Sequence, residues 1–258
     1  MLIHVSGEPI TSASNPLLKS VRRAVARGGL TRDGYIVAET PHLLREALRS
    51  GCEIGAVLVA ASARIEMPDN VRVLELDNGL FRSVAATEAP QGVIALVRPK
   101  VWRMYELFPR NALVVVLDGV QDPGNAGTVI RSAEAFGATG IVFLKGTVSP
   151  YNPKAVRASA GSVFRVPLVT GVSPEEARAA LASVDRYAAS ARGAVTAASA
   201  AFVRPCAIII GSEGAGISEG MSAGAVGIRI PTTGVESLNA ATAAAILLYE
   251  ARRQRTSA

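Results

Sequence analysis

The first regular pattern in the chain is helical. Apolar residues repeat with the period of an α-helix over 15–28, where Asn15 is suited to cap the helix, Pro16 to begin it and Gly28 to end it. The opposite face is basic. Its basic residues are Lys19, Arg22, Arg23 and Arg27. We predict an amphipathic helix whose basic face is either simply solvated or a contact for the phosphates of a nucleic acid.

Short strands and helices alternate after this helix. The pattern predicts strands near 35–38, 56–60, 71–76 and 93–97, and a helix that opens at Thr40 and Pro41 and closes at Gly51. Residues 1–99 are therefore expected to form a compact α/β domain. Pro99 and Pro109 bound a segment that contains the only tryptophan. Residues 100–110 are therefore predicted to be a linker that Trp102 pins against a domain.

The alternation restarts near Leu113. Continuous apolar runs at 113–117, 141–144 and 207–210, with Ile228 and Ile230, are typical of strands buried on both faces of a parallel sheet. Helices are expected near 126–136, 154–160, 174–183 and 238–253. Residues 111–258 are therefore predicted to form a second α/β domain.

Composition narrows the class of protein. The 258 residues are 49% hydrophobic and carry a net charge of +6, which favours a globular protein with an anionic partner. No signal peptide or membrane span is recognisable, so a cytoplasmic location is expected. Cys52 and Cys206 are predicted to be buried thiols rather than ligands of zinc. Because His4 and His42 both lie in the first third, a site in the second half would lack the commonest general base.

Most of the recognisable chemistry lies in three polar stretches. They occupy 125–131, 211–216 and 231–239, and read N-A-G-T-V-I-R, G-S-E-G-A-G and P-T-T-G-V-E-S-L-N. Each follows an apolar strand. Ligands bind at the carboxyl ends of the strands in open α/β sheets, so the three stretches predict one composite site.

Each stretch also has a purely structural interpretation. Asn125 is expected to cap the helix that follows it, and Arg131 is either a surface partner of Glu134 or part of the site. The glycines of 211–216 mark either a turn or a close approach to a ligand; their spacing is not that of a dinucleotide fingerprint, and the sequence contains no phosphate-loop motif. Ser237 or Asn239 is available to cap the last helix. The small residues of that helix indicate either close packing, such as that at a subunit interface, or simply high helix propensity.

The ordered set of motifs resembles the SpoU (TrmH-like) branch of the SPOUT RNA methyltransferases. The similarity covers 113–253 and includes D-P-G-N-A-G-T-V-I-R, A-S-A-G at 158–161, G-S-E-G-A-G and I-P-T-T-G-V-E-S-L-N. The first hundred residues look like the N-terminal substrate-binding domain of this family, which resembles RNA-binding ribosomal proteins.

The resemblance implies a fold, a cofactor and a reaction. The fold would be α/β, with a trefoil-knotted parallel sheet in the C-terminal domain and a smaller ribosomal-protein-like RNA-binding domain before it. The protein would be a homodimer that transfers a methyl group from S-adenosylmethionine to a ribose 2′-hydroxyl of RNA, without a metal. By motif position, the cofactor-binding residues would be Ser190, Gly211, Ile230 and Leu238.

The resemblance also assigns catalytic roles. Arg131 takes the position of the catalytic arginine, which helps to deprotonate the 2′-hydroxyl or binds the adjacent phosphate. Arginine side chains have a pKa above about 12, so an arginine base requires either a site that suppresses its charge or a phosphate that relays the proton. The residues expected to orient Arg131, the ribose and the methionine end of the cofactor are Asn125, Glu213, Ser237 and Asn239.

Several functions are compatible with these residues. The leading hypothesis is a ribosomal-RNA 2′-O-methyltransferase, because the N-terminal domain looks like those of ribosomal-RNA members. A transfer-RNA enzyme is the alternative within the same class. A non-catalytic RNA-binding protein of this fold is disfavoured by the intact motif residues, and an enzyme acting on a generic phosphate ligand by the missing phosphate-loop and metal motifs.

Overall fold

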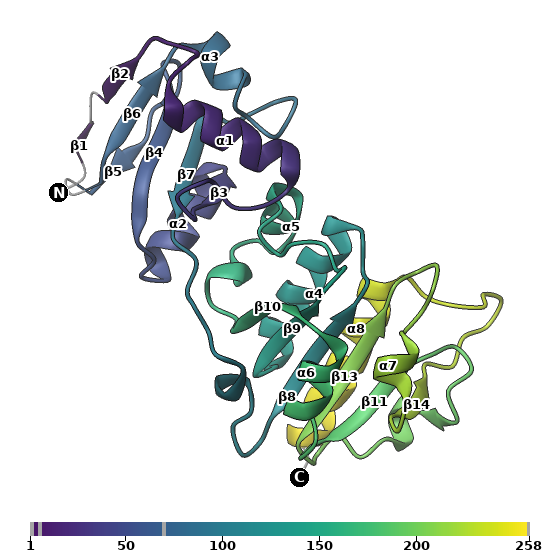
Figure 1. Cartoon of the computed structure of the whole chain (residues 1–258). Coiled ribbons are helices and arrows are strands. Elements are labelled where there is room, and N and C mark those ends of the chain that lie inside the picture. The colour runs from purple at the N-terminus through teal and green to yellow at the C-terminus, as the bar shows by residue number, and fades with distance from the viewer. Residues whose placement is uncertain (1–2, 5–6, 69–70, 257–258) are drawn as a thin grey trace. The chain divides into compact units, whose positions relative to one another are not determined.

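The chain forms two compact units in a computed structural model that describes residues 3–4, 7–68 and 71–256 (Figure 1). Unit 1 comprises Met1–Lys100 and Pro150–Phe164, and unit 2 comprises Val101–Ser149 and Arg165–Ala258. The sequence-based ranges assign 150–164 to the second domain, whereas this segment packs in unit 1. The physical reason lies partly at Gly161, where the absence of a side chain makes room for Glu46.

Unit 1 is built on a five-stranded sheet. Its strand order is β2-β6-β4-β7-β3, in which β2, β6 and β4 are parallel and β7 runs antiparallel to both β4 and β3. The strands are β2 (Glu8–Ile10), β3 (Ile36–Glu39), β4 (Ile54–Ala60), β6 (Val73–Leu76) and β7 (Val93–Val97), with a separate antiparallel pair of β1 (Ile3–His4) and β5 (Glu66–Met67). The helices are α1 (Pro16–Arg27), α2 (Pro41–Arg49), α3 (Asn78–Arg82) and α5 (Pro153–Ala158).

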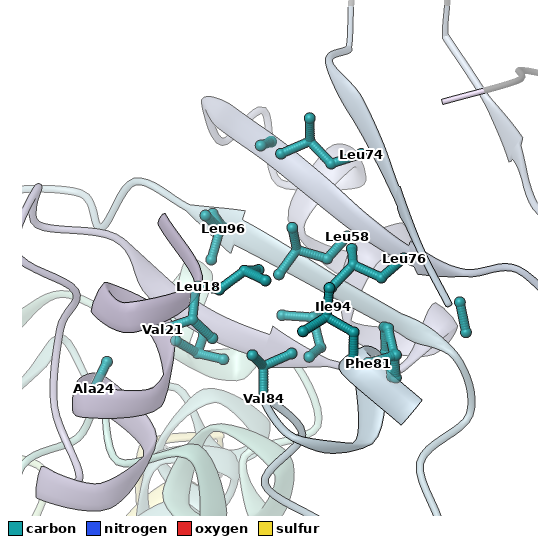
Figure 2. Close-up of a cluster of buried hydrophobic side chains, with 14 residues drawn as sticks. Leu18, Val21, Ala24, Leu58, Leu74, Leu76, Phe81, Val84, Ile94 and Leu96 are labelled. Carbon is teal, nitrogen blue, oxygen red and sulfur yellow. The ribbon is translucent and has the colours of Figure 1, made fainter. Parts of the chain in front are cut away.

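The predicted amphipathic helix is confirmed as α1. The Asn15 side chain accepts a hydrogen bond from the Leu17 amide at 2.9 Å, and Gly28 ends the helix in the left-handed region at φ +68°. Leu18 and Val21 point from α1 into the core of unit 1, where they gather with leucines of β4, β6 and β7 (Figure 2). Each fully buried leucine or valine contributes roughly 1.5–3 kcal/mol.

Unit 2 is built on a seven-stranded sheet in which every pair of neighbouring strands is parallel. The order is β10-β9-β8-β13-β11-β14-β12. The strands are β8 (Leu113–Asp118), β9 (Gly140–Leu144), β10 (Leu168–Val172), β11 (Asp185–Ala189), β12 (Val195–Thr196), β13 (Cys206–Gly211) and β14 (Val226–Arg229). The helices are α4 (Pro123–Phe136), α6 (Pro174–Ala180), α7 (Glu219–Ser222) and α8 (Ala240–Thr256).

The apolar runs predicted as buried strands are confirmed as β8, β9 and β13. The sequence pattern does not identify β10 and β11, because polar residues such as Thr170 and Asp185 interrupt their apolar runs. These two strands are only partly buried. Hydrophobic periodicity therefore finds the central strands and misses partly exposed ones.

The linker segment packs against unit 2. It contains a short 3₁₀ helix, Met104–Leu107, in which Leu107 is fully buried beside Gly140. Trp102 and Phe108 pack against the core of unit 2, as expected for a tryptophan that pins a linker to a domain.

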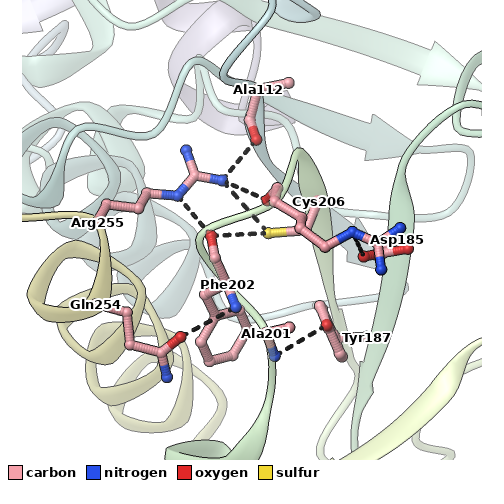
Figure 3. Close-up of polar contacts among 9 residues, drawn as sticks. Ala112, Asp185, Tyr187, Ala201, Phe202, Cys206, Gln254 and Arg255 are labelled. Carbon is pink, nitrogen blue, oxygen red and sulfur yellow. Dashed lines mark hydrogen bonds and ion pairs between the residues drawn. The ribbon is translucent and has the colours of Figure 1, made fainter. Parts of the chain in front are cut away.

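Hydrogen bonds of Arg255 fasten the end of α8 to neighbouring segments of unit 2 (Figure 3). The Arg255 guanidinium donates to the carbonyl oxygens of Phe202 at 2.7 Å, Asn111 at 2.6 Å and Ala112 at 2.8 Å. These carbonyls lie in the segments that precede β13 and β8. Nearby, burial raises the pKa of the Cys206 thiol to about 11. The prediction of buried thiols holds for Cys206, whereas Cys52 is only partly buried.

Candidate active site

Four neighbouring strands of unit 2 end at one edge of its sheet. They are β8, β13, β11 and β14, and because they are parallel their carboxyl ends lie together. The first polar stretch follows β8, the second begins at the end of β13, and the third follows β14. The folded chain therefore brings all three stretches to the same edge, as the strand-end argument predicts.

Asn125 is not the cap of α4, contrary to the sequence-based expectation. The helix begins at Pro123, and the Asp122 side chain caps it by accepting a hydrogen bond from the Asn125 amide at 2.9 Å. Proline is favoured at the first helical position and aspartate before it, so the sequence D-P carried the start signal that the prediction missed. Asn125 lies inside the first turn, where its side chain is available for tertiary contacts.

Asn125 links the three polar stretches through its side-chain amide. Its Nδ2 donates to the Glu213 carboxylate, and its Oδ1 accepts from Nδ2 of Asn239 at 3.0 Å. Oδ1 of Asn239 accepts from the amides of Ala241 at 2.9 Å and Thr242 at 3.2 Å, so Asn239 also caps α8. We call Glu213, Asn125 and Asn239 the bridging triad. Because each amide is held at both ends, the three side chains are fixed relative to one another.

The stretch 211–216 forms a closed loop. The amides of Ser212 and Gly216 each donate to the other residue's carbonyl at 3.0 Å. A Cβ atom at Gly211 would lie closer than 3.0 Å to the backbone of Gly216 and Ile217, so the close approach at Gly211 is to its own loop. The turn interpretation therefore explains this glycine. At Gly214, in contrast, a Cβ atom would meet nothing within 4 Å.

A second anchor holds the segment after this loop. Asp118, the last residue of β8, is only 8% exposed, and its carboxylate accepts a hydrogen bond from the Ser218 amide at 2.7 Å. Asp118 is not among the residues predicted for the site. The signal that could have found it is an aspartate that directly follows an apolar strand and precedes a glycine.

The residues expected to bind the cofactor lie at this edge. Ser190 follows β11, Gly211 ends β13 and Ile230 follows β14, and these three strands are neighbours. The Ser190 amide donates to the Ile228 carbonyl at 2.9 Å, which ties this turn to β14. Ile230 and Leu238 are half-buried apolar residues. The edge thus combines backbone groups with partly exposed apolar surface.

Arg131 and Ser237 lie outside the bridging triad. Arg131 is exposed on α4, six residues or about 9 Å along the helix axis from Asn125, and forms no hydrogen bond or ion pair with any residue that the structure describes. Glu134, its alternative partner, binds Arg165, whose Nη2 lies 3.0 Å from the carboxylate. Ser237 is exposed and Asn239, rather than Ser237, caps α8.

The basic positions of α1 differ in their surroundings. Lys19, Arg23 and Arg27 are exposed and, at a spacing of four residues, form one row along the helix. Arg22 is half-buried and donates to the Ala13 carbonyl at 2.8 Å and to the Ser83 hydroxyl at 2.8 Å. The row of three is therefore available to a partner, whereas Arg22 braces α1 within unit 1.

Neither a membrane-spanning helix nor a cluster of metal ligands occurs in the described part of the chain, 3–4, 7–68 and 71–256. No helix there is long and apolar enough to cross a membrane. No group of three or more histidine, cysteine or acidic residues there is arranged to hold a metal ion.

The site can be compared with known proteins. Residues 112–249 match the model of the SpoU rRNA methylase family, and residues 15–95 match an MRM3-like substrate binding domain. The chain is 31% identical to the 23S rRNA (guanosine(2553)-2′-O)-methyltransferase RlmP of Bacillus subtilis, over 94% of this chain and 98% of that one.

Solved structures of methyltransferases are also similar to this chain. An AdoMet-bound rRNA methyltransferase from Sinorhizobium meliloti superposes with a TM-score of 0.81 at 29% identity, covering 95% of this chain and 97% of that chain. The SpoU methyltransferase AviRb from Streptomyces viridochromogenes, in complex with AdoMet, also superposes with a TM-score of 0.81, at 28% identity over 94% of this chain and 99% of that chain. The α/β fold, the ordered motifs and these matches agree, and the chain belongs to the SpoU rRNA methylase family.

Proposed function

We propose that this protein transfers a methyl group from S-adenosylmethionine to a ribose 2′-hydroxyl of ribosomal RNA. The observation that carries the proposal is the bridging triad, which joins the three polar stretches at the carboxyl edge of the parallel sheet. Two further findings support it: relatives are named as ribosomal-RNA 2′-O-methyltransferases, and similar structures contain AdoMet. We also propose a cytoplasmic location, where ribosomal RNA would be the substrate.

The residues at the sheet edge fit this cofactor chemically. Ile230 and Leu238 offer half-buried apolar surface for an adenine ring, and the backbone at Ser190 and Gly211 offers hydrogen-bonding groups at the ends of neighbouring strands. Bound S-adenosylmethionine supplies an electrophilic methyl group attached to a positively charged sulfur. The exposed carboxylate of Glu213 provides the complementary charge nearby.

Arg131 would act on the RNA side of the reaction. We assign its guanidinium to bind the phosphate next to the target ribose, for which its paired N–H donors are well suited. That phosphate would relay the proton of the 2′-hydroxyl to solvent as the methyl group is transferred, because a cationic arginine is a poor base. Asn125, Glu213, Ser237 and Asn239 would orient the ribose and the methionine end of the cofactor.

A homodimer would complete this site. Arg131 is exposed and about 9 Å along α4 from Asn125, so a second copy packed against α4 and α8 would enclose it in a water-poor site. The α8 surface is suited to this contact, since Ile246 and Tyr249 are 37% and 56% exposed. Tyr249 also meets Phe136 of α4 edge to face, with ring centres 5.8 Å apart.

We further propose that the chain of unit 2 forms a trefoil knot.

The test is methyl transfer from labelled S-adenosylmethionine to total RNA that lacks the modification. The large ribosomal, small ribosomal and transfer RNAs are then separated, and the labelled ribose is identified by nuclease digestion. Label at a 2′-oxygen of ribosomal RNA is the expected result. Label confined to transfer RNA would show that transfer RNA, not ribosomal RNA, is the substrate. If the cofactor binds but no RNA is labelled, the enzymatic proposal is refuted in favour of an RNA-binding protein. The dimer is tested by sedimentation of the wild type and of Tyr249→Asp.

A further inference from the structure

The carboxyl edge of the sheet in unit 1 contains a cavity of about 660 Å³. Strands β2, β6 and β4 are parallel, and β3 runs in the same direction because it and β4 are both antiparallel to β7. Four carboxyl ends therefore lie at this edge. Residues that follow β4, residues of α3 and residues that precede β7 line the cavity, which is open to solvent. In open α/β sheets, this is the edge at which ligands bind.

The wall that follows β4 is held by hydrogen bonds. The Asn78 Oδ1 atom accepts from the Ser62 amide at 3.3 Å and from the Ser62 hydroxyl at 2.8 Å. Nη1 of Arg64 donates to the carbonyls of Ala61 at 2.9 Å and Ala63 at 3.0 Å. These hydrogen bonds hold the exposed turn after β4 in one conformation.

The wall that precedes β7 is held by a buried carboxylate. Glu39 is 1% exposed and accepts hydrogen bonds from the Ala86 amide at 2.7 Å and from the Thr87 hydroxyl. The far end of the same wall is Gly92, at φ +76°, where a Cβ atom would lie within 3.0 Å of Ala63. Burying a carboxylate is costly unless it is paired. The bonds from Ala86 and Thr87 satisfy the Glu39 carboxylate and hold the loop before β7 in a defined shape before any ligand binds.

The rim of the cavity carries complementary charged and polar groups. Arg82, Glu88 and Gln91 are exposed and line the cavity, and none of their side chains forms a hydrogen bond or ion pair with another residue that the structure describes. The rest of the lining includes the small residues Ala60, Ala63 and Gly92 together with Phe81. Asn78 also lines the cavity, but its amide oxygen is already bonded to Ser62. The cation, carboxylate and amide that remain, those of Arg82, Glu88 and Gln91, match a single nucleotide. The arginine suits its phosphate, and the other two suit the edge of its base.

We propose that this cavity binds one unpaired guanine nucleotide of the RNA substrate, with Arg82 on its phosphate and Glu88 on its base. Guanine is favoured because its N1–H and N2–H groups are adjacent donors that match the two oxygens of a carboxylate. Adenine, cytosine and uracil offer no such pair. The proposal rests on the proposed function for its substrate class.

A neighbouring basic surface strengthens the choice of RNA. Arg22 of α1 donates to the Ser83 carbonyl at 3.2 Å and to the Ser83 hydroxyl at 2.8 Å, and Ser83 directly follows Arg82. The exposed row of Lys19, Arg23 and Arg27 therefore lies on a helix that is fastened beside the cavity. A single strand whose phosphates follow this helix would have a base within reach of the rim.

The binding test uses the full chain and fluorescein-labelled pentamers of uridine with G, A, C or U at the centre, measured by anisotropy at low salt. The wild type is expected to prefer the guanine pentamer about tenfold. Glu88→Gln should abolish this preference, and Arg82→Ala should weaken all four pentamers several-fold. Glu66→Gln and Arg45→Ala, which change exposed residues outside the cavity, should match the wild type. Equal binding of the four pentamers, or wild-type behaviour of both cavity variants, would overturn the proposal.

Methyl transfer to ribosomal RNA separates this proposal from the proposed function. We expect both cavity variants to raise KM for RNA several-fold with little change in kcat. If the wild type methylates RNA and the cavity variants match it, the cavity proposal fails alone. If the wild type transfers no methyl group but binds the guanine pentamer through Glu88, the proposed function fails alone.

Discussion

Replacing Gly211 by alanine tests whether the closed loop 211–216 positions the active site. The added Cβ atom would lie within 3.0 Å of the carbonyl carbon and oxygen of Gly216 and of the Ile217 nitrogen, whereas ordinary contacts begin at 3.4 Å. All three obstacles are backbone atoms, so no side chain can rotate away. We expect about 1–3 kcal/mol of lost stability from this overpacking. Glu213, two residues further on, would move by up to about 1 Å, which lowers the rate on the order of 10²-fold.

The matched control is Gly214→Ala in the same loop. A Cβ atom there meets nothing within 4 Å, so this variant should keep wild-type stability and rate. Thermal unfolding measures the first quantity, and single-turnover methyl transfer to ribosomal RNA measures the second. If Gly211→Ala methylates and melts like the wild type, or if Gly214→Ala is equally damaged, the reasoning from loop closure is refuted.

Three further predictions concern other parts of the chain. Arg131→Ala should abolish methyl transfer while calorimetry still detects cofactor binding; measurable turnover would contradict the assignment. Arg255→Ala should lower the free energy of unfolding in urea by about 2–4 kcal/mol, because it leaves several carbonyls without their donor, whereas exposed Arg252→Ala should change it by less than about 0.5 kcal/mol. Burial raises the pKa of Cys206 from 9.0 to about 11. The contribution of its neutral thiol to the free energy of unfolding is therefore fully present below pH 9 and is lost as pH rises through about 11. This loss amounts to about 2–3 kcal/mol, and Cys206→Ala should remove it from the pH profile of stability; an unchanged profile would contradict the prediction.

The sequence alone determined those helix ends and buried strands that depend on neighbouring residues in the chain. Asn15 and Gly28 predicted both ends of α1, and unbroken apolar runs predicted β8, β9 and β13. The order of the three polar stretches was sufficient to indicate the family. These signals are readable because caps and buried strands depend on neighbouring residues or on a simple period.

Only the tertiary structure decided which side chains meet. Asn125 and Asn239 are 114 positions apart, and no periodicity relates an amide on α4 to the cap of α8. The same holds for Glu39, whose carboxylate shapes a loop 47 residues away. Such contacts follow from the order of strands in a sheet, which sets what lies beside each strand end. Local sequence specifies the elements, whereas the pairing of distant strands brings together the polar groups of the site.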